Sequence, residues 1–184
     1  MFIKKLELVK EKGKMVLRKT GYLTKEELVN SKCYPSEERF NKGPVAIIEC
    51  TEEIPCNPCE AACKFKAIKI GKPITNIPIL DENLCIGCGL CIAKCPGLAI
   101  FIVDKTYSDK EGLTSFPYEY LPLPVTGSIV EAVNREGKVV SSGKVIKVLN
   151  KKSFDRTPVV TIAIPKEKLD EARGIKRLES EDLN

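Results

Sequence analysis

The sequence predicts an α+β fold whose core consists of two related halves packed about a pseudo-two-fold axis, with extensions on both sides. Residues 56–70 align without gaps on residues 88–102, so an internal repeat with an offset of 32 residues lies near the middle of the chain. Eight of the nine cysteines fall between Cys50 and Cys95. Beyond the repeat, strand-like runs alternate with turn residues, which is typical of a small β-rich domain.

The N-terminal extension is expected to cover residues 1–43. Apolar residues alternate with charged ones over 1–20, which predicts a β-hairpin. Thr24 is followed three residues later by Glu27, the pattern of a capping box. We therefore expect a short helix over 25–30.

The remaining chain is expected to form three parts. Residues 44–104 contain the repeat, and each half reads as a loop, a short helix and a strand. Residues 105–124 are rich in proline and aromatic residues and predict a linker on the surface. Residues 125–184 predict a small barrel-like β domain, followed by a short helix that begins at Pro165 and ends near Gly174. Its strands are expected at 125–133, 138–140, 144–149 and 159–164, with turns at 134–137 and 141–143.

Composition limits the chemistry that the chain can perform. It has nine cysteines and no histidine, so the commonest general acid–base group is absent. No Gly-x-Gly-x-x-Gly occurs, and no catalytic residue is assigned. No apolar run approaches the length of a membrane span, which predicts a cytoplasmic protein without membrane insertion. The formal charge of +5 would be largely cancelled by anionic metal clusters, so a nucleic-acid partner is not expected.

The second half of the repeat carries four cysteines in one compact run. Cys85, Cys88, Cys91 and Cys95 are separated by two, two and three residues, and Pro96 follows. This is the iron–sulfur spacing of bacterial ferredoxins, in which three thiolates on one loop bind a cluster. The fourth cysteine of such a run binds the other cluster in two-cluster proteins.

The first half carries a related but altered run. Cys50 is separated from Cys56 by five residues, and Cys59 and Cys63 follow with the usual spacing. Lys64 stands where the run normally has proline. Neither change removes a ligand, but the longer loop alters the backbone near the sulfur atoms, whose hydrogen bonds tune the reduction potential.

We therefore expect two [4Fe–4S] clusters that exchange one ligand between the halves. Cluster I would be bound by Cys50, Cys56, Cys59 and Cys95, and cluster II by Cys85, Cys88, Cys91 and Cys63. The alternatives are disulfides, which the cytosolic character disfavours, and structural zinc, which usually joins two separate cysteine pairs. A first site that holds [3Fe–4S] or nothing is a third alternative. Cys33 stands alone and is interpreted as an unliganded thiol, with a regulatory or ninth-ligand role as the alternative.

Residues 44–104 resemble a bacterial-type two-cluster ferredoxin domain, on the cysteine runs just quoted. The resemblance covers about a third of the chain and implies one-electron transfer. The layout with flanking extensions is similar to iron–sulfur subunits that accompany flavin-dependent amino-acid dehydrogenases acting on proline or hydroxyproline. This similarity implies a hetero-oligomer with a flavoprotein oxidoreductase, with FAD or FMN on the partner and not on this chain. A free ferredoxin-type carrier is the first alternative, and a redox-sensing or nucleic-acid-binding iron–sulfur protein is the second.

Overall fold

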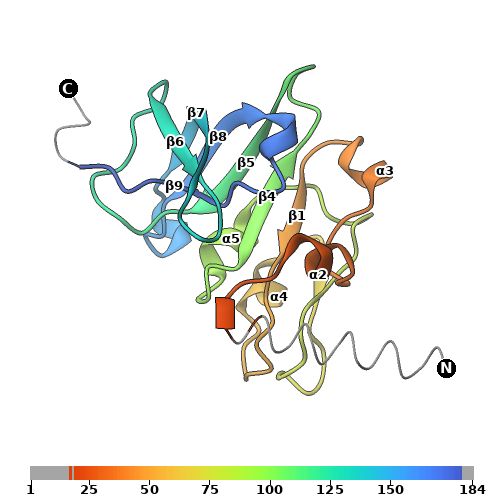
Figure 1. Cartoon of the computed structure of the whole chain (residues 1–184). Helices are drawn as coiled ribbons and strands as arrows, with labels where there is room; N and C mark the ends of the chain where they lie inside the picture. Colours follow the sequence, from red (N-terminus) through yellow and green to blue (C-terminus); the bar gives the residue numbers. More distant parts are fainter. Residues whose placement is uncertain (1–16, 18, 180–184) are drawn as a thin grey trace.

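The protein, described here for residues 17 and 19–179 of a computed structural model, has one large antiparallel sheet with short helices beside it (Figure 1). The order of its seven strands is β1-β4-β5-β8-β7-β6-β9. Their bounds are β1 Val45–Ile48, β4 Ile100–Asp104, β5 Glu111–Pro117, β6 Ile129–Val133, β7 Val139–Leu149, β8 Val159–Pro165 and β9 Gly174–Ile175. A second sheet pairs β2, Ile68–Lys69, with β3, Ile79–Leu80. The expected α+β class is thus confirmed.

The helices are all short and lie mainly before and within the repeat. They are α2 Lys25–Val29, α3 Glu37–Phe40, α4 Pro58–Ala62 and α5 Leu90–Lys94, with 3₁₀ turns at Lys152–Phe154 and Lys166–Lys168. The predicted capping box is present: the Glu27 N–H donates to Thr24 Oγ1, and the Thr24 N–H donates to Glu27 Oε2 at 2.8 Å. The hairpin predicted over 1–20 lies almost wholly outside the described residues.

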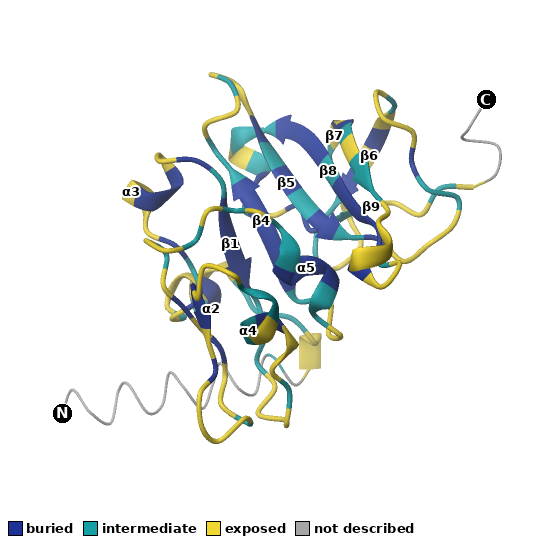
Figure 2. Ribbon diagram, turned by 180° about the vertical axis from the view of Figure 1, so that it is seen from behind, coloured by how far each residue is buried: buried dark blue, intermediate teal, exposed yellow. Residues whose placement is uncertain are grey.

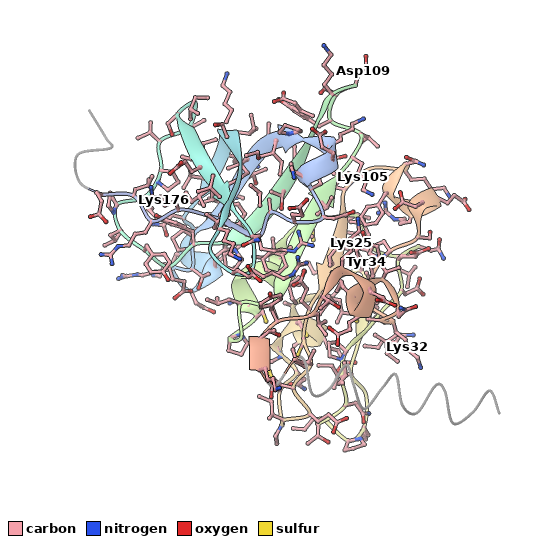
Figure 3. All side chains as sticks on the ribbon, viewed as in Figure 1. Lys25, Lys32, Tyr34, Lys105, Asp109 and Lys176 are labelled. Carbon is pink, nitrogen blue, oxygen red and sulfur yellow. The ribbon has the colours of Figure 1, made fainter. Side chains whose placement is uncertain are left out.

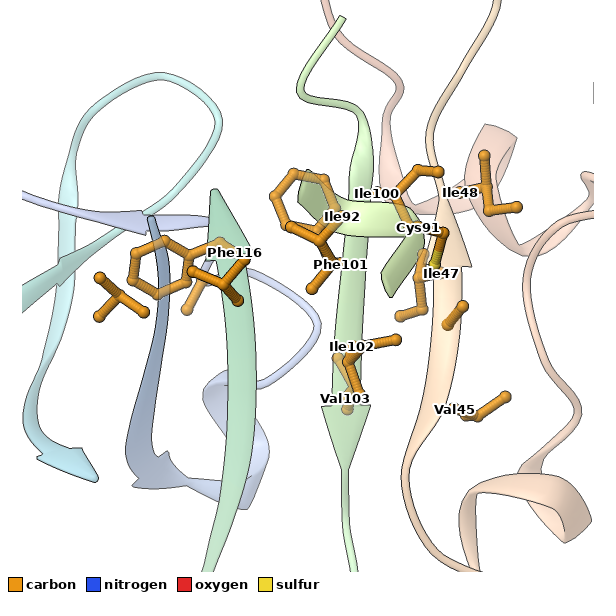
Figure 4. Close-up of a cluster of buried hydrophobic side chains, with 14 of the residues drawn as sticks. Val45, Ile47, Ile48, Cys91, Ile92, Ile100, Phe101, Ile102, Val103 and Phe116 are labelled. Atoms are coloured by element: carbon orange, nitrogen blue, oxygen red, sulfur yellow. The ribbon is translucent and has the colours of Figure 1, made fainter. Parts of the chain in front are cut away.

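The core lies around β1 and β4, the two strands that the repeat contributes to the large sheet. All four residues of β1 and the first four of β4 are buried. Ile92 of α5 is fully buried and belongs to the same cluster, which Figure 4 shows together with Phe116 of β5. The apolar runs of β1 and β4 are continuous because both faces of these strands are covered.

Residues 105–124, predicted to be a surface linker, instead contain a central strand. β5 pairs with β4 on one side and with β8 on the other. Gly112, Thr114 and Phe116 are buried on its inner face, while the residues between them are not. The proline and aromatic content hid a strand with the usual two-residue alternation.

The strands of the C-terminal region join the sheet that contains β1 and β4, so the expected separate barrel is replaced by an extension of one sheet. The turn predicted at 141–143 lies inside β7. A Cβ atom on Gly143 would lie 2.8 Å from Ile164 Cγ2. This glycine therefore serves close strand packing and not a turn.

The helix predicted from Pro165 to Gly174 is only a 3₁₀ turn over Lys166–Lys168. Pro165 ends β8, where it pairs with Glu111. The Arg173 N–H donates to the Val133 carbonyl at 2.9 Å, and Arg173 Nη1 donates to the Leu169 carbonyl at 2.9 Å. In a continued helix the Leu169 carbonyl would accept from the Arg173 N–H. Instead, the carbonyl accepts from the buried Arg173 side chain, and the N–H bonds to Val133 at the start of the β6–β9 pairing. Within the described part of the chain, no helix is long and apolar enough to cross a membrane.

Candidate metal centres

The two halves of the repeat have the same backbone arrangement. In each half a strand is followed by a cysteine loop, a five-residue helix and a second strand. β1 pairs with β4, and β3 pairs with β2, so each half's first strand pairs with the other half's second strand. The registers Ile48↔Ile100 and Leu80↔Ile68 are related by the 32-residue offset of the sequence repeat. The pairing is therefore pseudo-symmetric at the level of single residues.

The first cysteine group surrounds a cavity of about 220 Å³ beside α4. The four cysteines that line it are Cys50, Cys56, Cys59 and Cys95. Three come from the loop after β1 and from α4, and Cys95 comes from the end of α5 in the other half. The long insert between Cys50 and Cys56 lines the same cavity through Thr51, Glu52 and Ile54.

The second group surrounds a smaller cavity, of about 20 Å³, beside α5. Its four cysteines are Cys63, Cys85, Cys88 and Cys91. Cys63 comes from the end of α4, so this group also takes one thiol from the other half. Cys88 is exposed and Cys91 is buried, which places this site at the protein surface.

Backbone amides approach the sulfur atoms in a repeated pattern. The Ala67 N–H donates to Cys63 Sγ at 3.2 Å, and the Ala99 N–H donates to Cys95 Sγ at 3.4 Å. Lys66 and Leu98, which precede these amides, both have positive φ although neither is glycine. Such conformations cost energy and persist where the surroundings require them. Here they turn an N–H toward each exchanged thiol, where it would stabilise a thiolate ligand.

Burial raises the pKa of the thiols that point inward. It raises the pKa of Cys59 to about 11, with Cys95 and its other neighbours adding to the shift. It also raises the pKa of Cys91, which is surrounded by Cys85, Cys88 and Cys63. The thiols that raise the pKa of Cys59 and Cys91 are thus members of the same group as each of them. A metal that binds these groups must displace protons, which couples metal binding to folding.

The residues present fit a multinuclear cluster better than the alternatives. All nine cysteines are free, so no disulfide links them. Among the residues that the structure describes, no three cysteine or acidic side chains converge closely enough to hold a single metal ion. The four thiols of the first group instead surround a cavity of about 220 Å³, which leaves room for a cluster bound through its corner irons.

Two buried arginines near these groups escaped the sequence analysis. Arg39 of α3 donates to four backbone carbonyls, those of Glu82, Gly43, Pro44 and Cys85, at 2.5–3.0 Å. It thereby fixes the loop that begins the second cysteine run. The neighbouring Glu37 and Glu38 are typical of a solvated surface, so the sequence gave no signal of this role.

The second arginine, Arg173, forms an ion pair with Glu49, the residue before Cys50. Its Nε donates to Glu49 Oε1 at 2.5 Å, and Arg135 Nε donates to Glu49 Oε2 at 2.6 Å. Partial burial of Glu49 would raise its pKa, but the two guanidinium groups outweigh burial and lower it. The side chains that hold Glu49 beside the first site therefore come from the C-terminal region, from the turn after β6 and the residue before β9.

Cys33 lines neither cavity. Its thiol is buried and donates to the Pro78 carbonyl at 2.8 Å. Burial raises its pKa to about 12, so it is a neutral thiol in a packed environment. The structure thus places Cys33 apart from both cysteine groups, and its interpretation as an unliganded thiol stays a prediction.

Comparison with known proteins matches residues 78–101 to the 4Fe-4S binding domain family. An uncharacterized ferredoxin of Methanocaldococcus jannaschii is 42% identical over 50 residues, which are 27% of this chain and 28% of that protein. The chain therefore contains a 4Fe–4S binding domain and is an iron–sulfur protein of the ferredoxin type.

Longer matches come from a second class of relatives. Protein Pixie of Drosophila melanogaster is 32% identical over 130 residues, 62% of this chain and 20% of that protein. Translation initiation factor RLI1 of Chaetomium thermophilum is 29% identical over 143 residues, 71% of this chain and 20% of that protein. The chain thus spans about a fifth of the length of these relatives. No solved structure matches it.

Proposed function

We propose that the chain binds two [4Fe–4S] clusters and passes single electrons through them. The observation that carries the proposal is the four-and-four grouping of the cysteines, with one thiol exchanged between the halves. Cluster I would be held by Cys50, Cys56, Cys59 and Cys95, and cluster II by Cys85, Cys88, Cys91 and Cys63. The clusters supply the redox chemistry, and the protein supplies binding, hydrogen bonds to sulfur and exclusion of water.

If each cluster is bound by three cysteines of one half and one cysteine of the other, single cysteine variants should fall into two groups. Cys95→Ala should lose the same cluster as Cys56→Ala, although Cys95 belongs to the second run. Cys63→Ala should likewise resemble Cys88→Ala. Cys33→Ala is the matched control, because that thiol is buried outside both cavities.

The measurement is iron and sulfide content after anaerobic reconstitution, with electron paramagnetic resonance spectra of the reduced protein. The parent chain and Cys33→Ala should carry about eight irons, and each ligand variant about four. If Cys95→Ala instead gave the spectrum of Cys88→Ala, the exchange of ligands would be wrong. About four irons in the parent chain would mean that one site does not hold [4Fe–4S].

We further propose that the chain is one subunit of a hetero-oligomer. In it, electrons pass between this chain and a flavoprotein oxidoreductase that carries FAD or FMN. The support for this proposal is the layout, because extensions precede β1 and follow β4, outside the repeat that carries the cysteine runs. A free electron carrier is the simpler version of the same function.

A second candidate function is favoured by the length of the comparison matches. The similarity to Pixie and the RLI1 factors covers 130 and 143 residues, compared with 50 for the ferredoxin. It therefore reaches beyond the cysteine runs into the extensions. In this version the same clusters serve a translation-related assembly.

Anaerobic affinity purification of the chain from its native cell separates these versions. A flavin-containing partner at fixed stoichiometry supports the oxidoreductase subunit, and ribosomal proteins or translation factors support the second candidate. The chain recovered alone with its full iron content indicates a free carrier.

A further inference from the structure

The segment between the two cysteine runs carries an unusual concentration of positive charge. Residues 61–80 contain four lysines and no acidic residue. All four lysines, Lys64, Lys66, Lys69 and Lys72, are exposed. None of them forms a salt bridge with any residue in the described part of the chain. This segment therefore presents uncompensated cations to solvent.

Large apolar side chains are exposed beside these lysines. Phe65 is 44% exposed, Ile79 is 47% exposed and Ile86 is 52% exposed. Lys69 and Ile79 are directly opposite in the β2–β3 pair, so their side chains share one face of that small sheet. Figure 2 shows the loops beside α4 largely in the colour of exposed residues. Lys64, Phe65, Lys66, Lys69, Ile79 and Ile86 are called the cationic hairpin face below.

The part of this face around Phe65 and Ile86 borders the second cysteine group, whereas Lys69 and Ile79 lie on the opposite side of the β2–β3 pair from Ile68, which lines that group's cavity. Phe65 and Ile86 line the same cavity as the exposed Cys88. Lys64 directly follows Cys63, a member of that group. A protein that covered the cationic hairpin face would therefore come close to cluster II, where this half of the molecule approaches the surface.

We propose that the cationic hairpin face docks an acidic redox protein, so that electrons enter or leave through cluster II. The inference rests on the proposed function for the role of cluster II. Exposed apolar residues with a charged rim mark interaction sites, and charge complementarity speeds the encounter of redox proteins. In each transfer cluster II loses the one electron that the partner's flavin gains, or the reverse, and no covalent bond changes.

The composition of the face argues for a protein partner over nucleic acid. Its apolar residues are one phenylalanine and two isoleucines, and its cations are all lysine. Single-stranded nucleic acid is typically held by several stacking aromatic side chains with arginine. The chain's own residues 1–16 are an unsuitable occupant, because they carry five lysines against two glutamates and would repel the face.

The test uses the full chain, reconstituted anaerobically, with an acidic flavodoxin as the probe. The test variant combines Lys64→Glu with Lys66→Glu. The matched control combines Lys144→Glu with Lys147→Glu, two exposed lysines of β7 in the C-terminal part of the sheet. Binding is measured as a function of salt, and one-electron transfer to the flavin is followed by stopped-flow absorbance in the same samples.

At low ionic strength the test variant should bind flavodoxin about tenfold more weakly or worse, while the control pair stays near the parent. The difference should shrink at high salt, where charges are screened. Lys69→Glu with Lys72→Glu, farther from the cysteines, should show the same direction and covers the case in which the first variant loses iron.

Equal binding by the test and control variants would overturn the proposal, as would failure of the parent to bind flavodoxin at low salt. Binding of a labelled single-stranded RNA that depends on Lys64 and Lys66, without binding of flavodoxin, would replace it by a nucleic-acid surface. Charge-dependent binding without electron transfer would leave the docking face intact and would count against the proposed function instead.

Discussion

The first half of the repeat, residues 45–69, and the second half, residues 79–104, share their strand pairing and differ in what surrounds them. The cysteines of the first group line a cavity of about 220 Å³ that includes an inserted loop, whereas those of the second line one of about 20 Å³ with an exposed thiol. Glu49 directly precedes the first cysteine of the first site, and its carboxylate is held by Arg135 and Arg173 of the C-terminal region. The second begins at a loop that Arg39 of the N-terminal extension fixes. Arg39 of the N-terminal extension thus holds the loop of the second half, whereas the C-terminal region contacts both halves, through Glu49 and through the pairing of β5 with β4.

The strand pairing of the two halves is pseudo-symmetric, so differences between the sites come from the loop inserted between Cys50 and Cys56 and from the side chains that the extensions bring to each site. Buried charge and hydrogen bonds near a cluster alter its potential. Different buried arginines lie beside the two cysteine groups, which allows the two potentials to be adjusted separately.

The largest effect is expected where the C-terminal strands hold the first half. Glu49→Ala leaves two arginines without their shared carboxylate, and Arg173 is buried. Removing one partner of a buried ion pair costs about 3–5 kcal/mol. We expect a loss of that size in the free energy of unfolding, measured in denaturant with the cluster absorbance as a second probe.

Glu38→Ala is the matched control for this prediction. Glu38 pairs with Lys42 at 2.6 Å, but both side chains are largely exposed. Its removal should change the free energy of unfolding by less than about 1 kcal/mol. Similar losses in both variants would mean that the Glu49 cluster does not join the C-terminal strands to the first half.

The next effect concerns the loop of the second half. Gly87 has φ +66°, and a Cβ atom there would lie 2.5 Å from Pro44 Cβ and 2.6 Å from its carbonyl carbon. Backbone strain and overpacking each cost about 1–3 kcal/mol, so Gly87→Ala should destabilise the loop and reduce the iron bound by the second group.

Gly89, two residues on, separates the two contributions. It also has positive φ, +77°, but a Cβ atom would meet only Ile92 Cδ1 at 3.8 Å. Gly89→Ala should therefore cost about 1 kcal/mol, from conformation alone. If iron content fell equally in both variants, contact with Pro44 would not be what shapes this loop.

Arg39 tests whether the N-terminal extension adjusts the second site. Arg39→Met removes hydrogen bonds from a charged group to four carbonyls, and we expect a loss of about 1.5–3 kcal/mol in stability. It also removes a buried positive charge near Cys85. The reduced cluster is the more negative form, so its potential should fall.

The measurement is a redox titration of both clusters in the parent and in Arg39→Met. The shift should be confined to the cluster that Cys88→Ala removes. An equal shift of both potentials, or of neither, would show that the extension does not act on one half separately.

The sequence was informative where a motif depends on local spacing. The cysteine runs and the 32-residue offset predicted which residues the structure brings together, and Thr24 with Glu27 predicted the start of α2. These patterns have a fixed chemical reason within a few residues. The ligand roles themselves stay predictions until metal binding is measured.

The parts that were missed depend on contacts between distant segments. β5 was interpreted as a linker because its prolines outweighed the alternation of Gly112, Thr114 and Phe116. The prediction of a helix after Pro165 was wrong because Arg173 hydrogen-bonds to Glu49 and Val133, residues far away in sequence. Glu49 itself looks like one more surface acid until the sheet brings two arginines to it.

The smallest effect probes Asp170, where the two extensions touch each other. Its carboxylate accepts from Tyr34 Oη at 2.9 Å and pairs with Lys25 at 2.9 Å; Figure 3 labels Lys25 and Tyr34, both of the N-terminal extension. Burial would raise the pKa of Asp170, but Lys25, Tyr34 and the nearby Lys105 outweigh it and hold the pKa below its usual range.

A carboxylate with a lowered folded-state pKa contributes stability that is present above its unfolded pKa, near 4, and is lost as the pH falls through the lowered value. Asp170→Asn should therefore be less stable than the parent by about 1 kcal/mol at pH 7, and the two should converge toward pH 3. Because both proteins carry the same acid-labile sites, the difference between their unfolding curves, followed from pH 7 down to pH 3, isolates this carboxylate. A difference that did not change over this range would show that the contact between the extensions depends on packing and not on charge.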